Sequence, residues 1–141
     1  MICPRCKMTL TIKNIEGEDI EVCHSCNGMW IHKRQLNNLL KESGGDVEKS
    51  SIDDNPHEDK YPIIKCRECK DTTMKKINFL DYSNIIFDYC PSCGGFWLDK
   101  NELANMHEYI KIVEEGSHDV KNISVYNMLV KLSEIAYSIF H

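Results

Sequence analysis

The strongest hydrophobic periodicity of the chain lies in residues 122–140. Apolar side chains recur there at intervals of three and four residues, which is the repeat of one face of an α-helix. This stripe consists of Val125, Met128, Leu132, Ile135 and Ile139. A second apolar face on the same segment consists of Tyr126, Leu129, Val130, Tyr137 and Phe140. The pattern predicts a helix with one face on a neighbouring helix. Its other face is expected to cover the rest of the chain or another subunit.

Two shorter segments also show helical spacing. Residues 33–42 place Leu36, Leu39 and Leu40 on one side, and glycines follow. Residues 100–115 carry an apolar stripe made of Leu103, Met106, Ile110 and Val113. Asp99 and Glu102 have the spacing of a capping box at the start of this second helix. His32 and Gln35 hold the same positions before the first helix and predict a weaker start.

Two other regions alternate between apolar and polar residues, as strands with one buried face do. In the first, Leu10 and Ile12 are followed by a turn at 16–19 and then by Ile20 and Val22. In the second, a strand around Met74–Leu80 leads through a turn at 81–84 to a return strand at 85–89. Each region predicts a β-hairpin.

A Cys-x-x-Cys pair stands at each end of both hairpins, and these pairs contain all eight cysteines. A tight loop of this kind, called a knuckle below, directs two sulfurs at one ion, and two loops held together by a hairpin supply a tetrahedral Zn²⁺ site. The pattern predicts two zinc ions per chain. Their ligands are expected to be Cys3, Cys6, Cys23 and Cys26 for one ion and Cys66, Cys69, Cys90 and Cys93 for the other.

The predicted fold is a small, metal-stabilised α+β protein. It contains two zinc ribbons, each with a β-hairpin between knuckles and a following helix, and a C-terminal amphipathic helix. The expected divisions are a first ribbon at 1–42, a flexible acidic linker at 43–60, a second ribbon at 61–116 and the final helix at 117–141.

Three other arrangements of the cysteines remain open at this point. They are four disulfides, iron in place of zinc, and a cross-braced site in which Cys3 and Cys6 share an ion with Cys66 and Cys69. A site closed by four thiolates has no position for water or substrate. The sequence therefore predicts a structural metal and a protein that is not an enzyme.

The formal net charge is −5, and the acidity is concentrated in one segment. Residues 43–59 carry one Lys against six Asp and Glu, which alone gives −5. Each Zn²⁺ with four thiolates adds further negative charge. This balance disfavours strong non-specific binding to phosphate backbones, which requires clustered Lys and Arg.

We expect no membrane association and a cytoplasmic location. The sequence contains no apolar run long enough to cross a bilayer. It begins Met1-Ile2-Cys3-Pro4, without the basic and apolar regions of a secretory signal. Paired Cys-x-x-Cys motifs in a reducing compartment favour metal over disulfides.

Residues Cys90–Leu103 resemble the TFIIB-type zinc ribbon family, also called the transcription-factor zinc-finger family. The resemblance rests on Cys-Pro-x-Cys-x-Gly-x-Trp-Leu-Asp-x-x-Glu-Leu. The first repeat is similar but looser, with His24, Ile31, His32 and Gln35 at four of these positions. The resemblance implies a tandem pair of zinc ribbons and a link to transcription.

Some side chains beside the knuckles are candidates for nucleic-acid contacts. They are Arg5, Lys7, Lys33, Arg34, Arg67 and Lys70. Lys7 and Lys70 each follow the second cysteine of a first knuckle, where ribbons often carry glycine. Trp30 and Trp97 could stack on bases, but packing over the zinc sites is the favoured interpretation. His24 is expected to be exposed rather than a rival ligand.

Three functions are compatible with these features. The first is a non-enzymatic zinc-binding adaptor, linked to transcription or another nucleic-acid process, that holds a protein partner, or a second copy, through the C-terminal helix. The second is direct nucleic-acid binding through the ribbons. The third is a redox or zinc sensor, in which oxidation ejects the metal and the repeat unfolds.

Overall fold

A computed structural model of the chain describes residues 2–41, 62–78, 85–116, 120 and 123–140. Its elements are β1 (Thr11–Ile15), β2 (Glu18–Val22), β3 (Met29–His32), α1 (Lys33–Leu40), β4 (Lys75–Asn78), β5 (Ile86–Tyr89), β6 (Gly95–Leu98), α2 (Lys100–Glu114) and α3 (Ile123–Phe140). The predicted hairpins and all three predicted helices are present. The linker predicted at 43–60 and the turn predicted at 81–84 lie outside the described residues.

The two repeats form one antiparallel sheet of six strands, in the order β1-β2-β3-β6-β5-β4. The central pair, β3 and β6, joins the repeats. Its register places Trp30 opposite Trp97, Met29 opposite Leu98 and Ile31 opposite Phe96. Because the two tryptophans hold equivalent places in the repeats, this pairing relates the two halves by a local two-fold axis. The sequence analysis did not predict β3, β6 or their pairing.

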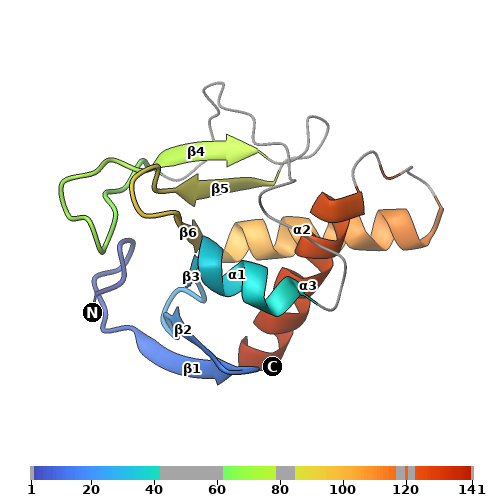
Figure 1. Ribbon diagram of the computed structural model, residues 1–141, viewed down its shortest axis with the longest axis horizontal. Coiled ribbons are helices and arrows are strands. Elements are labelled where there is room, and N and C mark those ends of the chain that lie inside the picture. Colours follow the sequence, from blue (N-terminus) through green and yellow to red (C-terminus); the bar gives the residue numbers. More distant parts are fainter. Residues whose placement is uncertain (1, 42–61, 79–84, 117–119, 121–122, 141) are drawn as a thin grey trace.

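Alternation along the strands gives the sheet two different faces. Ile20, Val22, Phe87, Phe96 and Leu98 belong to one core cluster together with residues of all three helices. The intervening tryptophans belong to a second cluster, which contains the cysteines. Figure 1 shows α2 and α3 to the right of the sheet and the knuckle loops of both repeats to its left.

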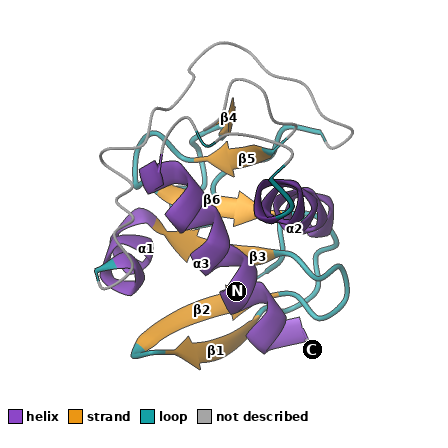
Figure 2. Cartoon of the chain, turned by 90° about the vertical axis from the view of Figure 1, so that its right-hand side faces the viewer, coloured by secondary structure: helices purple, strands orange, loops and turns teal. Residues whose placement is uncertain are grey.

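The C-terminal helix packs inside the chain. Val125, Met128, Leu132 and Ile135 are buried in the same cluster as Leu36 of α1 and residues of the first hairpin. Figure 2 shows α3 running across the sheet between α1 and α2. The Lys131 ammonium contacts the Glu16 carboxylate at 2.6 Å, which ties α3 to the first hairpin turn.

Most of the second apolar face of α3 is also covered. Leu129 is buried, and Tyr126, Val130 and Phe140 pack against the core, whereas Tyr137 is 68% exposed. Within the part of the chain that the structure describes, no helix combines the length and apolarity that crossing a bilayer requires.

Candidate metal centres and the cleft between the knuckles

The eight cysteines gather into two groups of four, one in each repeat. In the first group, Sγ of Cys3 lies 3.7 Å from Sγ of Cys26, and Sγ of Cys6 lies 3.3 Å from Sγ of Cys23. In the second group, the corresponding distances are 3.6 Å for Cys66 to Cys93 and 3.9 Å for Cys90 to Cys69. In each pair, one sulfur comes from the first knuckle and one from the second.

The geometry excludes two of the three alternatives that the sequence left open, the disulfides and the cross-braced site. All eight thiols are free, and their separations are far above the roughly 2.05 Å of a disulfide bond. Each group draws its sulfurs from one repeat, so the cross-braced arrangement is wrong. The physical reason is that each hairpin already brings its own two knuckles together.

The donor sets fit zinc. A tetrahedral ion with Zn–S bonds of about 2.3 Å has S···S edges of about 3.8 Å. Three of the four separations, 3.7, 3.6 and 3.9 Å, are close to this value, and the Cys6–Cys23 separation of 3.3 Å is shorter. Zn²⁺ bound by these four sulfurs would hold the two ends of each hairpin together. The two groups therefore suit two zinc ions per chain.

Every knuckle places the residue after its second cysteine in the left-handed backbone region. The values of φ are 64° for Lys7, 58° for Asn27, 58° for Lys70 and 80° for Gly94. Amide N–H groups in these loops approach the sulfurs, with Arg5 N 3.4 Å from Cys3 Sγ and Cys69 N 3.4 Å from Cys66 Sγ. The left-handed conformation costs an ordinary L-residue about 1–2 kcal/mol, yet both first knuckles carry lysine there.

Burial raises the pKa of four of the thiols, those of Cys3, Cys26, Cys66 and Cys93. A hydrogen bond with the Met8 backbone lowers the pKa of the Cys6 thiol to about 7. Zinc binds the thiolate form, so binding must release the protons that the buried thiols hold. Zinc affinity is therefore expected to fall as the pH falls.

Each tryptophan packs against the other repeat. A Cβ atom on Gly28 would overlap the ring of Trp97, and a Cβ atom on Gly95 would overlap the ring of Trp30. Trp30 is 3% exposed and Trp97 is fully buried, and both share a cluster with the cysteines. Packing over the metal sites is thus confirmed, and the glycine of each second knuckle is explained by close approach of the opposite tryptophan.

A buried ion-pair network links the first knuckle of repeat one to the strands of repeat two. The Arg5 guanidinium lies 2.9 Å from the carboxylate of Asp88 and 3.0 Å from that of Asp99. Asp88 also pairs with Lys76 at 3.2 Å, and Asp99 accepts a hydrogen bond of 2.9 Å from Trp97 Nε1. Burial raises the pKa of Asp88 to about 6, although Lys76 and Arg5 oppose that shift.

A second ion pair joins an arginine of repeat two to a carboxylate of repeat one. The Arg67 guanidinium, from the first knuckle of repeat two, lies 2.9 Å from the carboxylate of Glu21 on β2. It also lies 5.7 Å from the centroid of the Trp30 ring, within the range of a cation–π contact. Glu21 and Asp88 are equivalent strand positions, each opposite a tryptophan of the neighbouring strand. The two repeats are therefore joined by charges as well as by the sheet.

The structure shows a capping box at the start of α1, where a weaker start was predicted, and none at the start of α2, where one was predicted. His32 caps α1 through its Nδ1, which accepts from Arg34 N at 3.1 Å, and the Gln35 side chain accepts from His32 N at 3.0 Å. Asp99 makes no side-chain cap on α2, so the capping box predicted there is wrong. The Asp99 carboxylate binds Trp97 and Arg5 instead, and Glu102 accepts from Ile86 N at 3.0 Å.

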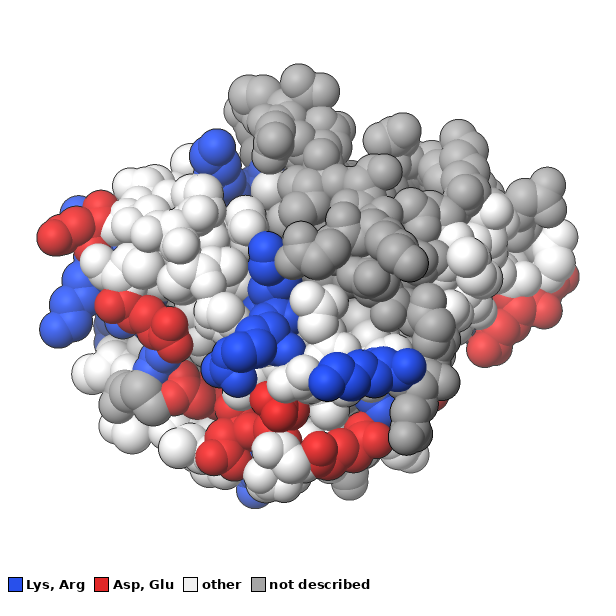
Figure 3. Space-filling view, in the orientation of Figure 1, with Lys and Arg blue, Asp and Glu red and all other residues white. Residues whose placement is uncertain are grey.

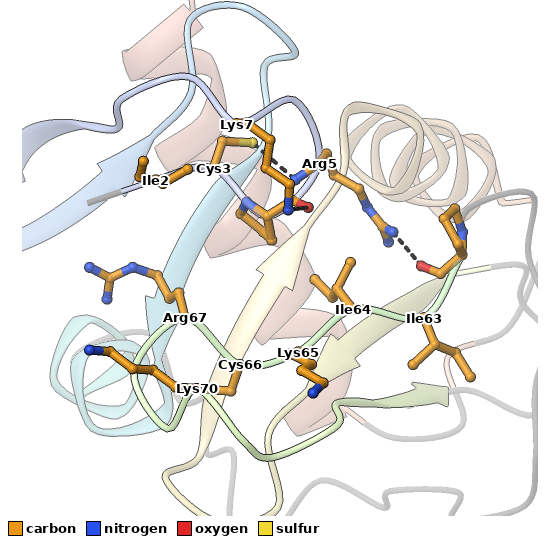
Figure 4. A pocket seen from close by; sticks show the side chains of 12 residues that line it. Ile2, Cys3, Arg5, Lys7, Ile63, Ile64, Lys65, Cys66, Arg67 and Lys70 are labelled. Atoms are coloured by element: carbon orange, nitrogen blue, oxygen red, sulfur yellow. Dashed lines mark hydrogen bonds between the residues drawn. The ribbon is translucent and has the colours of Figure 1, made fainter.

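A cleft of about 720 Å³ lies between the first knuckles of the two repeats. Figure 4 shows one wall formed by residues 2–7 and the opposite wall by residues 62–70. The cationic lining residues are Arg5, Lys7, Lys65, Arg67 and Lys70, and the apolar ones include Ile2, Ile63 and Ile64. Ile2 and Ile63 are 55% and 63% exposed.

The cations predicted as nucleic-acid contacts fall into three kinds of environment. Arg5 and Arg67 are mostly buried in the ion pairs described above, with 10% and 9% of their side chains exposed. Arg34 is 69% exposed and lies 3.9 Å from Glu18, and Lys33 is half-buried on α1. Lys7 and Lys70 are exposed at the cleft.

Sequence reasoning did not find several residues of the ion pairs and of the cleft. Glu21, Asp88 and Ile63 carry no motif, and their roles depend on partners from the other repeat. His24 is exposed, as predicted, and its ring contacts that of Phe140 edge to face. His32 and Glu68 lie beside Cys93, so one thiolate of the second centre has a histidine and a carboxylate close to it.

The fold and the two cysteine groups define a tandem zinc-ribbon protein. A family model described as "Transcription factor zinc-finger" matches residues 2–42 and 65–108, which together are more than half of the chain. The chain belongs to this family of TFIIB-type zinc ribbons. No curated protein matches it, and no solved structure does.

Proposed function

We propose that this protein is a non-enzymatic, zinc-stabilised adaptor that binds a protein partner in the cytoplasm, within transcription or a related nucleic-acid process. The single observation that supports this most is the position of the cleft. It lies between the two first knuckles. The metal-ligating cysteines support the same proposal, because each group already provides four sulfurs.

A protein partner fits the exposed surface better than nucleic acid does. The cleft combines exposed isoleucines with lysines, and none of the described residues that line it is aromatic, so these residues offer no ring on which a base could stack. Among the described residues on the face shown in Figure 3, Lys and Arg near the centre are bordered by Asp and Glu. Both tryptophans are buried.

The experiment that tests this proposal is site-specific photo-crosslinking of the zinc-loaded full chain in cells. A benzophenone amino acid replaces either Ile63 in the cleft or Ile123 on α3, two side chains of similar exposure, 63% and 62%. The adaptor function predicts one discrete protein adduct from at least one position. The identified partner, made separately, should then bind the purified chain with a defined stoichiometry.

Two outcomes would overturn the proposal. One is the absence of any protein adduct from both positions. The other is an adduct that disappears after nuclease treatment, which would favour direct nucleic-acid binding. Loss of the adduct after zinc chelation is the expected control, because the cleft exists only while the knuckles are folded.

A further inference from the structure

We propose that the cleft between the two first knuckles binds an acidic peptide segment that also carries apolar side chains. This inference rests on the proposed adaptor function and names the chemistry of the partner. The cleft volume of about 720 Å³ lies within the range of pockets that enclose ligands, about 300–1,000 Å³.

The charge of the cleft comes from three lysines rather than from its arginines. Arg5 and Arg67 are held by Asp88, Asp99 and Glu21, so their charge is offset within the protein. Among the described residues, the salt bridges found include none to Lys7, Lys65 or Lys70. Of the residues that the structure describes, no Asp or Glu lines the cleft. A ligand with carboxylates would therefore supply the missing negative charge.

The positions of Lys7 and Lys70 strengthen this argument. They are equivalent in the two repeats, and both adopt the left-handed conformation, with φ of 64° and 58°. The second knuckles place Asn27 and Gly94 at the corresponding positions, and these residue types tolerate that conformation better. The chain thus carries a locally unfavourable lysine only at the two knuckles that form the cleft.

The apolar residues of the cleft select a peptide over a polyphosphate. Ile2 and Ile63 stand exposed beside the lysines, and Pro4 and Pro62 add further apolar surface. Figure 4 shows Ile63 and Ile64 on the wall that also carries Lys65. Exposed isoleucine is stabilised by contact with apolar side chains, which a peptide provides and a phosphate backbone does not. Together the lysines and isoleucines match a segment in which acidic and apolar residues alternate.

The test uses fluorescence anisotropy with the zinc-loaded full chain and a labelled synthetic peptide that alternates glutamate and leucine. Control probes are the same peptide with lysine in place of glutamate, a glutamine version, and a labelled oligothymidine. The proposal predicts that only the glutamate peptide binds well and that added salt weakens it. Equal binding of all peptides, or tighter binding of oligothymidine, would overturn it.

Matched variants locate the contact. The double variant Lys7→Gln/Lys70→Gln should lower the affinity for the glutamate peptide by about tenfold. The control Lys13→Gln/Lys75→Gln makes the same charge change on exposed strand lysines and should change this affinity by less than about twofold. Ile63→Ser should weaken binding by about threefold, and Ile12→Ser, on β1 and 54% exposed, should not. Equal effects of the cleft variants and their controls would contradict the proposal.

A second variant separates lost binding from lost folding. Lys7→Gly/Lys70→Gly removes both charges and also suits the left-handed backbone, so the melting temperature should stay or rise while peptide affinity falls about tenfold. If this variant binds the peptide normally, the cleft is not the site. The adaptor function can still stand in that case, because an adduct at Ile123 alone would place a protein partner elsewhere.

Discussion

The two repeats start their helices in different ways although they occupy equivalent places in one sheet. In the first repeat, His32 and Gln35 complete a capping box on α1. In the second repeat, Asp99 has a side chain well suited to capping, but its carboxylate binds Arg5 and Trp97. By residue type, Asp99 is the better helix cap and His32 the poorer one, but in the structure only His32 caps its helix. The reason is that the buried Arg5 competes for the Asp99 carboxylate more strongly than a backbone amide does.

The two sets of ion pairs that join the repeats also differ, because Arg5 has more buried partners than Arg67. The Arg5 corner contains two buried carboxylates, a lysine and an indole N–H. At the other corner, Arg67 contacts Glu21 and the more exposed Glu68. The two repeats therefore have similar folds, but the ion pairs between them are unequal. Below, the Arg5 junction and the Arg67 junction are the groups in contact with each of these arginines, and the Arg5 junction contains more buried groups.

Removing one metal site should have the largest effect and should show whether the repeats fold as one unit. Structural zinc contributes roughly 10–16 kcal/mol in zinc peptides. Because β3 and β6 share one core, Cys66→Ser should unfold the second ribbon and also destabilise the first. Native mass spectrometry with metal analysis should show two zinc ions falling to one, and hydrogen exchange should accelerate in β1–β3. Unchanged protection of β1–β3 would mean that the halves are independent.

Truncating a tryptophan should have the next largest effect. Trp97→Ala should lower the free energy of unfolding by about 3–5 kcal/mol, because a fully buried side chain is lost from the face that carries the cysteines. Trp30→Ala should cost somewhat less, since Trp97 also donates a hydrogen bond to Asp99. Chemical denaturation at saturating zinc measures both. Equal losses of unfolding free energy for the two variants would contradict the extra contribution expected from the hydrogen bond between Trp97 and Asp99.

Arg5→Ala and Arg67→Ala test the two junctions directly. Arg5→Ala leaves Asp88 and Asp99 buried with fewer partners and should cost about 3–5 kcal/mol of unfolding free energy. Arg67→Ala should cost about 1–3 kcal/mol, because it leaves one mostly buried carboxylate, that of Glu21. The same denaturation assay applies, with Arg34→Ala, 69% exposed, as the control expected to change little. A larger loss from Arg67→Ala would reverse our interpretation of the junctions.

The helix starts give the smallest predicted effect. His32→Ala removes the cap of α1 and should cost about 1 kcal/mol. Asp99→Ser restores a good capping side chain to α2 but removes the charge that faces Arg5, so it should still destabilise by about 1–3 kcal/mol. Thermal unfolding at fixed zinc compares the two. Stabilisation by Asp99→Ser would show that the cap outweighs the ion pair.

Much of this site could be predicted because metal ligation leaves a local pattern. Each Cys-x-x-Cys loop and each hairpin is specified within a short stretch of chain, so spacing favours the grouping of Cys3, Cys6, Cys23 and Cys26 that the structure shows. Helices α1, α2 and α3 follow from their apolar stripes in the same way. In contrast, β3 and β6 are four residues long and lack clear alternation, so they resemble the irregular entry to a helix.

The sequence by itself determined the four knuckles, the hairpins and the helices, since each depends on neighbours within a few turns or one tight loop. It favoured one cysteine group per repeat, and the structure excluded the cross-braced alternative. Only the tertiary structure decided that Trp30 pairs with Trp97, that Arg5 reaches Asp88 and Asp99, and that the first knuckles face each other across a cleft. These contacts join residues more than fifty positions apart. They form because burying both repeats in one core lowers the free energy, and no local pattern records which distant surface will supply the partner.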